Sequence, residues 1–190
     1  YVAKRFAAYF NPFKDLTDSG LQLSHSYYAM SNGGWFGLGL GNSIEKTGYL
    51  PEATTDFVFS IVIEELGLIG AGLILALLFF LILRIMIVGV KARNPFNSMM
   101  ALGVGALMLM QVFVNIGGIS GLIPSTGVTF PFLSQGGNSL LVTSVGIAFV
   151  LNIAANEKRD NIVQAIEEGL SQTQELENQN EKIVPLRRSR

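Results

Sequence analysis

Three long apolar stretches dominate the hydrophobic pattern of this 190-residue chain. At ~1.5 Å per residue, a helix through each can cross a hydrocarbon core roughly 30 Å thick, although the third is near the lower limit of about 17 residues. The pattern predicts an all-α membrane protein with a mixed first segment, three spans and a polar tail. The predicted boundaries are 1–55 for the first segment, 56–156 for the membrane region, with spans at about 57–83, 98–116 and 138–155, and 157–190 for the tail.

The distribution of charge supports a lipid environment for the middle of the chain. Only 14% of the residues are charged and 49% are hydrophobic, with a mean hydropathy of +0.44, whereas soluble domains carry about 25% charged residues. No charged residue occurs between Asn94 and Asn156. Because a water-soluble domain needs a charged exterior, this part of the chain is expected to face lipid.

Charges in the connections indicate the orientation of the spans. Arg84, Lys91 and Arg93 lie between the first and second spans, a connection that the positive-inside rule assigns to the cytoplasm. These cations are expected to set the topology and to touch anionic lipid headgroups. The first segment and the connection 117–137 are then outer loops, and the tail is cytoplasmic. Cations also occur in the first segment, but long outer segments are partly exempt from the rule.

Two uncharged segments rich in glycine stand out. The stretch "NIGGISGLIPSTGVTFPFLSQGGNS" also contains prolines that break helices. Irregular backbone at membrane depth must be buried in protein or line a cavity, so we expect a re-entrant or cavity-capping outer loop, with an ordinary surface loop as the alternative. The stretch "SNGGWFGLGLGN" lacks the Gly-Lys-Ser/Thr of a phosphate-binding loop. Its glycines are expected to allow close turns and backbone approach.

Several classes of chemistry are excluded or left open by composition. The chain has no cysteine, and its single histidine, His25, excludes a multi-histidine metal site within this sequence.

No secretory signal peptide is visible, and the opening "YVAKRFAAYFNPF" resembles the interior of a longer protein sequence. We therefore expect further membrane segments ahead of it. The tail has a weak helical pattern and is expected to be solvated and partly disordered.

Asp56 lies where the polar first segment meets the first span. One interpretation is helix capping, because an acid or hydroxyl at a helix start satisfies free amides and suits the helix dipole. The other is a carboxylate at the membrane surface that acts as a general base. The sequence alone leaves both open.

Further charges lie on either side of Asp56. On a continuous helix, Glu64 and Glu65 would be roughly 12–14 Å deeper in the membrane than Asp56. Buried acids at such depth are functional candidates, but pairing with a neighbouring helix is favoured for these two over catalysis. Lys46 either holds an anionic group such as a pyrophosphate or is a solvated loop charge.

The stretches "AMSNGGWFGLGLGNSIEKTGYLPEATTDFVFSIVIEELGLIGAG" and "GLIPSTGVTFPFLSQGGNS" resemble the large outer loop with its following helix, and the last outer loop, of the SEDS (shape, elongation, division and sporulation) family. The similarity runs from about 11 to 159. It corresponds to the C-terminal part of a ten-span bundle and is greatest to the family's cell-division member. The sequence departs from the family pattern at Thr54, often histidine, and at Gln135 and Asn138 in the usual Ser-Tyr-Gly-Gly-Ser motif, which alters the lining of the site.

The resemblance implies a peptidoglycan glycosyltransferase that polymerises lipid II at the outer membrane face during cell division. It implies Asp56, in Thr-Asp-Phe, as the catalytic residue. It also implies a class B penicillin-binding protein and other divisome proteins as partners, and the plasma membrane at the division septum as location. A divalent cation is compatible with it, but no metal ligand is assigned. Candidate substrate-binding residues are Lys46, Glu52, Ser134 and Gln135. A lipid II flippase and a non-catalytic divisome scaffold remain alternatives.

Overall fold

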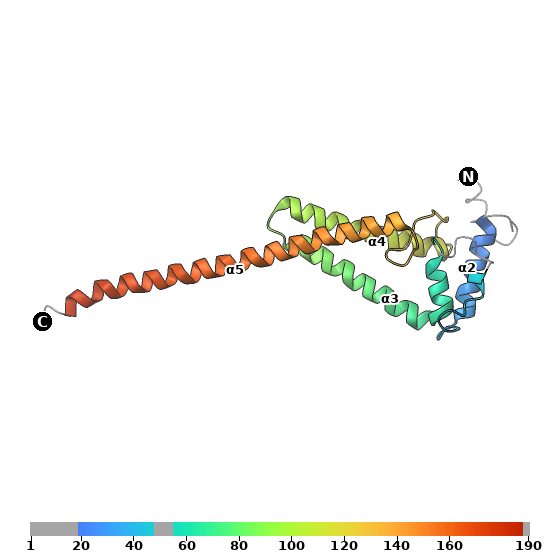
Figure 1. Ribbon diagram of the computed structural model, residues 1–190, viewed down its shortest axis with the longest axis horizontal. Helices are drawn as coiled ribbons and strands as arrows, with labels where there is room; N and C mark the ends of the chain where they lie inside the picture. Colours follow the sequence, from blue (N-terminus) through green and yellow to red (C-terminus); the bar gives the residue numbers. More distant parts are fainter. Residues whose placement is uncertain (1–18, 48–54, 188–190) are drawn as a thin grey trace.

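The structure is a computed structural model that describes residues 19–47 and 55–187. Within these ranges it is helical, without strands (Figure 1). The elements are α2 (Ser19–Gly33), the 3-10 helix η1 (Glu45–Thr47), α3 (Val58–Lys91), α4 (Pro95–Ile119) and α5 (Gly137–Arg187). Helices α3, α4 and α5 are each long and apolar enough to cross a membrane. The predicted all-α fold with three membrane helices is therefore confirmed.

Helix α3 is sharply bent at Gly67, where the backbone leaves helical geometry (φ 73°, ψ 178°). Figure 1 shows that the part before the bend runs beside α2, crosswise to the remainder of α3 and to α4. The predicted first span, 57–83, is thus divided in two, and only the part after Gly67 runs with the other long helices. The depth expected for Glu64 and Glu65 assumed a continuous helix, whereas the structure places the segment that carries them crosswise to the remainder of α3.

The segment after α2, residues 34–42, which we call the glycine loop, supplies partners for the backbone groups that the bend releases. The bonds are Leu38 N–H to Glu64 O (2.9 Å), Gly39 N–H to Glu65 O (2.9 Å), Leu68 N–H to Gly34 O (2.9 Å) and Ile69 N–H to Trp35 O (3.3 Å). Such exchange lets a helix break without leaving buried polar groups unpaired. A Cβ on Gly37 would lie 2.3 Å from Glu65 O, so the close backbone approach expected from the glycines is observed.

Small residues also allow the long helices to pack closely. Ala101 in α4 is fully buried, and Gly105 in α4 lies against Met86 and Ile85 of α3. Small side chains at such crossings bring helix backbones together.

Helix α4 begins with Asn94 as its N-cap, whose side chain accepts a hydrogen bond from Phe96 N–H at 2.9 Å.

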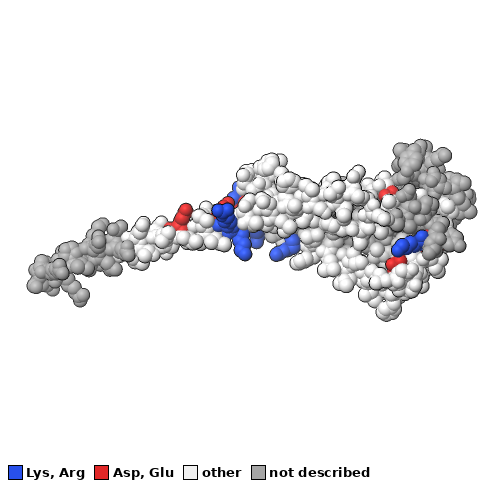
Figure 2. Space-filling view, viewed as in Figure 1, with Lys and Arg blue, Asp and Glu red and all other residues white. Residues whose placement is uncertain are grey.

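Helix α5 continues as one helix of 51 residues to Arg187 and extends far beyond the other helices (Figure 1). This differs from the partly disordered tail expected from sequence. The extension is rich in Glu and Gln, which favour helix. Figure 2 shows that Lys and Arg side chains gather where the largely uncharged body meets this extension.

Candidate functional site

Asp56 lies immediately before α3, beside the loop that joins α4 to α5. The N-cap of α3 is Phe57, which makes no side-chain capping hydrogen bond. Asp56 is therefore one residue ahead of the N-cap position that the capping interpretation would give it. Its side chain is partly exposed, whereas Phe57 is buried.

Asn115 of α4 fixes the backbone of Asp56. Its side-chain amide donates to Asp56 O and to Val128 O, both at 2.7 Å. Asn115 is only 4% exposed, so these bonds are shielded from water and hold their geometry better than surface bonds. One side chain thus joins the start of α3, the end of α4 and the α4–α5 loop (residues 120–136).

Ser134 forms a second tie between the α4–α5 loop and the start of α3. Its hydroxyl donates to Thr55 O at 2.6 Å and accepts from Phe130 N–H at 2.7 Å. Ser134 is buried, and its only hydroxyl proton is used within the protein. The structure thus brings Ser134 close to Asp56, where it holds the backbone of the preceding residue, Thr55. Gln135, the next residue, is exposed.

The α4–α5 loop is also held from within. Phe130 is buried and stacks on Phe59 of α3, with ring centroids 4.8 Å apart. Phe132 has a left-handed backbone (φ 63°), which is strained for a bulky residue. Such strain persists only where the surroundings fix the turn, here through Phe130 and Ser134.

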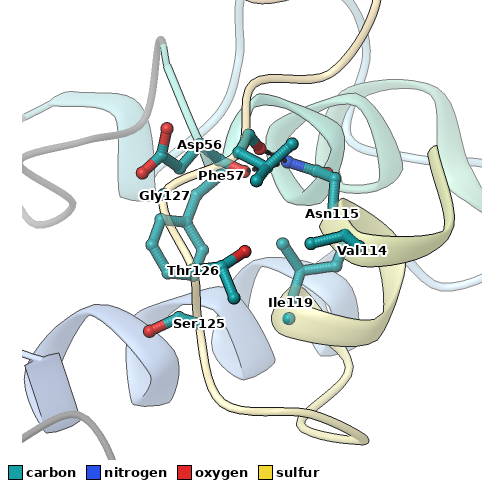
Figure 3. Close-up of a pocket in the computed structure, with 10 residues that line it drawn as sticks. Asp56, Phe57, Val114, Asn115, Ile119, Ser125, Thr126 and Gly127 are labelled. Carbon is teal, nitrogen blue, oxygen red and sulfur yellow. Dashed lines mark hydrogen bonds between the residues drawn. The ribbon is translucent and has the colours of Figure 1, made fainter. Parts of the chain in front are cut away.

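A small pocket opens between the start of α3, the end of α4 and residues 125–128 (Figure 3). Its volume is about 10 Å³, far below the roughly 300–1,000 Å³ of small-molecule sites. Figure 3 shows the Asp56 carboxylate pointing outward, away from Asn115 and the pocket interior. The pocket is therefore too small to enclose a small molecule, and the Asp56 carboxylate lies on its rim.

Glu64 is fully buried and is surrounded by hydrogen-bond donors. It accepts from Asn32 Nδ2 at 3.3 Å, from Ile44 N–H at 3.3 Å and from the Ser43 hydroxyl. A buried carboxylate is tolerated only with such compensation. Its contacts join α2, the segment before η1 and α3, which supports the structural interpretation of this acid.

Replacing Glu64 with alanine is expected to destabilise the full-length protein by about 3 kcal/mol, because three donors then lose a buried acceptor. Thermal unfolding in detergent measures the effect. Glu65→Ala is the matched control: Glu65 lies 3.7 Å from Lys46, and its buried Oε1 accepts no hydrogen bond from the described residues. Its removal should therefore destabilise the protein less than the removal of Glu64. Equal losses for the two variants would contradict the structural role of Glu64.

Lys46 is directed toward the bend in α3. Its ammonium lies 3.7 Å from Glu65 Oε1, and the two side chains are 52% and 12% exposed. Next to it, Glu45 Oε2 lies 2.6 Å from His25 Nδ1. The structure thus joins Lys46 to Glu65, and shows no contact between Lys46 and Asp56 that would support its prediction as a substrate ligand. Glu52, also predicted to bind substrate, lies outside the described residues.

A metal site does not emerge from the described part of the chain. There, no group of three or more His, Cys, Asp or Glu side chains converges. No step of the reaction proposed below is routed through a metal.

Sequence reasoning did not single out Asn115. A usable signal was present, because Asn115 is a polar residue close to the end of an otherwise apolar span, and such residues are commonly functional or buried against a partner. The sequence could not show which groups Asn115 binds, because Asp56 and Val128 come close to it only in the folded chain.

Comparison with known proteins gives consistent matches. The model of a family described as "Cell cycle protein", comprising FtsW, RodA and SpoVE, matches residues 1–159. Three relatives each carry the name probable peptidoglycan glycosyltransferase FtsW. The chain is 64% identical over 162 residues to the one from Lactococcus lactis subsp. lactis (strain IL1403), 51% over 156 residues to that of Enterococcus hirae and 47% over 150 residues to that of Bacillus subtilis (strain 168).

These matches include most of this chain but a minor part of each relative. They cover 85%, 82% and 79% of the chain. The same matches cover 39%, 39% and 37% of the three relatives. The chain thus spans about two fifths of their length.

Proposed function

The chain belongs to the FtsW, RodA and SpoVE family of cell cycle proteins, as its motifs predicted, and from this premise we propose that it carries the outer-face catalytic part of a peptidoglycan glycosyltransferase. The proposed reaction polymerises lipid II into glycan strands during cell division. The observation that supports it best is the pair of ties, through Asn115 and Ser134, that hold the backbone around Asp56. They present a partly exposed carboxylate on a fixed rim between two loops.

The proposed reaction is a glycosyl transfer between two lipid-linked sugars. The 4-hydroxyl of one disaccharide attacks the anomeric carbon of another, and Asp56 accepts the hydroxyl proton as the new C–O bond forms. The bond from the anomeric carbon to the pyrophosphate oxygen breaks, and undecaprenyl pyrophosphate leaves with the bonding electrons. A general base must be within hydrogen-bond reach of the proton that it takes, which fits a carboxylate that points out of the protein.

The setting of this reaction follows from the membrane character of the chain. Three helices suited to crossing a membrane are compatible with a substrate that keeps a polyprenyl anchor. We infer that the site lies at the outer surface of the bacterial plasma membrane, at the division septum. A class B penicillin-binding protein, as transpeptidase, and other divisome membrane proteins are the proposed partners.

Lipid II translocation is the second candidate, because broken helices and buried acids are typical of transporters. The bend at Gly67 and the buried Glu64 fit that description. However, Glu64 is already occupied by three donors from the protein, which favours polymerisation.

A reconstituted assay separates the candidate functions. The full-length protein, with its penicillin-binding protein, is placed in liposomes that contain lipid II, and polymer and lipid movement are scored together. We expect polymer that does not depend on translocation. Translocation without polymer would indicate the flippase, and neither activity would indicate the scaffold.

Asn115→Leu is expected to lower the polymerisation rate by roughly 10- to 100-fold, because a misplaced catalytic group loses rate even when the fold survives. The loss is expected in kcat with little change in KM. Asn152→Leu, an exposed asparagine in α5, is the matched control and should retain the native rate. Unfolding temperatures identify misfolding, and a folded Asn115→Leu protein with native kcat would refute this positioning role.

A further inference from the structure

A cluster of cations lies at the other end of α3 from Asp56. At that end α5 begins to extend beyond the other helices (Figure 1). A cavity of about 740 Å³ between these helices is lined by Arg84, Lys91, Arg93 and Lys158, together with the carboxylate of Glu157. Four cations and one carboxylate give this cavity, which we call the basic pocket, a net charge of +3. Its volume is within the roughly 300–1,000 Å³ of ligand sites.

Arg93 joins the two sides of the basic pocket through hydrogen bonds to α5. Its guanidinium donates to Gln164 Oε1 and Asn161 Oδ1 of α5, and its backbone N–H donates to Glu157 Oε1 at 3.0 Å. These bonds hold the short α3–α4 connection against α5. One wall of the cavity is therefore joined to α5, through hydrogen bonds that are exposed to solvent.

The other three cations are exposed, as Arg93 is. Among the described residues, Arg84, Lys91 and Lys158 form no ion pair within 4.0 Å. Like charges gathered without an acid for each of them repel one another, and an anion relieves that repulsion. The basic pocket thus has the electrostatics of an anion site.

The apolar wall of the basic pocket indicates which anion. Ile87, Val88 and Ala154 line it beside the cations, and the cluster lies at the end of long apolar helices (Figure 2). A free phosphate ion would gain nothing from an apolar wall. Basic pockets between membrane helices at the headgroup level suit anionic lipids, whose phosphate meets the cations while the acyl chains follow the helices.

We propose that the basic pocket binds the phosphate headgroup of an anionic phospholipid, with its acyl chains against α3 and α5. The lipid would link the end of α3 to α5 at the point where α5 extends from the membrane. This site is independent of the proposed glycosyl transfer, because none of its residues contributes to the Asp56 rim.

Native mass spectrometry of the full-length protein tests the proposal, with phosphatidylglycerol and phosphatidylcholine as probes. We expect selective retention of phosphatidylglycerol. One cation near an anionic headgroup contributes about fivefold in affinity, so Lys158→Gln should weaken retention about fivefold. The triple variant Arg84→Gln/Lys91→Gln/Lys158→Gln should weaken it at least tenfold.

Arg159→Gln is the matched control, because Arg159 neighbours Lys158 but does not line the cavity. Its effect should stay within about twofold, whereas general attraction to an anionic surface would make the two single variants equal and overturn the proposal. Equal retention of both lipids would also overturn it. Inorganic phosphate is a further probe: displacement of phosphatidylglycerol by millimolar phosphate would assign the site to the free ion. Thermal unfolding of each variant separates lost binding from lost fold.

Discussion

Asp56→Asn is expected to lower lipid II polymerisation by about 100- to 10,000-fold, the usual contribution of a positioned general base. The substitution keeps the size of the side chain and removes its ability to accept the proton of the attacking hydroxyl. The measurement is the initial rate of glycan synthesis by the full-length protein, reconstituted with the proposed class B penicillin-binding protein.

The control for this prediction is Asp160→Asn, the same chemical change at an exposed position of α5, which should leave the rate unchanged. Thermal unfolding establishes that the Asp56 variant is folded. A folded Asp56→Asn protein that polymerises lipid II at the native rate would remove Asp56 from the mechanism.

The structure gives a reason to expect a loss of rate without a loss of fold. Asn115 holds Asp56 through its backbone carbonyl, not through its carboxylate. The adjacent tie, from Ser134, also ends on a carbonyl, that of Thr55. Asparagine at position 56 retains both carbonyls, so the ties that shape the rim should survive the substitution.

The membrane helices were predictable because their signal is compositional. A long apolar run without charge has few alternatives to a lipid-facing helix, and α4 and α5 cover the second and third apolar stretches. The prediction that Asp56 lies near the start of a helix also came from composition, because the polar first segment and the first apolar run meet at Asp56. The length of α5 was missed, because charged helical extensions and disordered tails have similar compositions.

The details of the site were not predictable, because they depend on partners distant in sequence. Lys46 and Asp56 both lie ahead of the apolar run of α3, yet Lys46 pairs with Glu65 beside the bend. The bend depends on backbone groups of Gly34, Trp35 and Leu38, and an isolated glycine within an apolar helix gives no indication of such partners. Sequence therefore located the catalytic candidate, while the fold determined what surrounds it.

Gly67→Ala is expected to destabilise the full-length protein by about 3 kcal/mol, or to prevent folding. Left-handed backbone costs a residue with a Cβ about 1–2 kcal/mol, and Gly67 has φ 73°. The added Cβ would lie 2.4 Å from Trp35 O, and overpacking of this kind typically costs a further ~1–3 kcal/mol. The clash is with backbone on the glycine loop, which cannot move without breaking its bonds to α3.

Gly72→Ala is the matched control, one turn beyond the bend in the same helix. A Cβ there meets nothing within 4 Å, and alanine is favoured over glycine in a helix by roughly 0.5–1 kcal/mol. The control should unfold at the same or a slightly higher temperature, while Gly67→Ala unfolds earlier or is not recovered. If both variants unfold like the native protein, α3 can straighten without cost. The crosswise segment that carries Glu64 would then not be a fixed part of the fold.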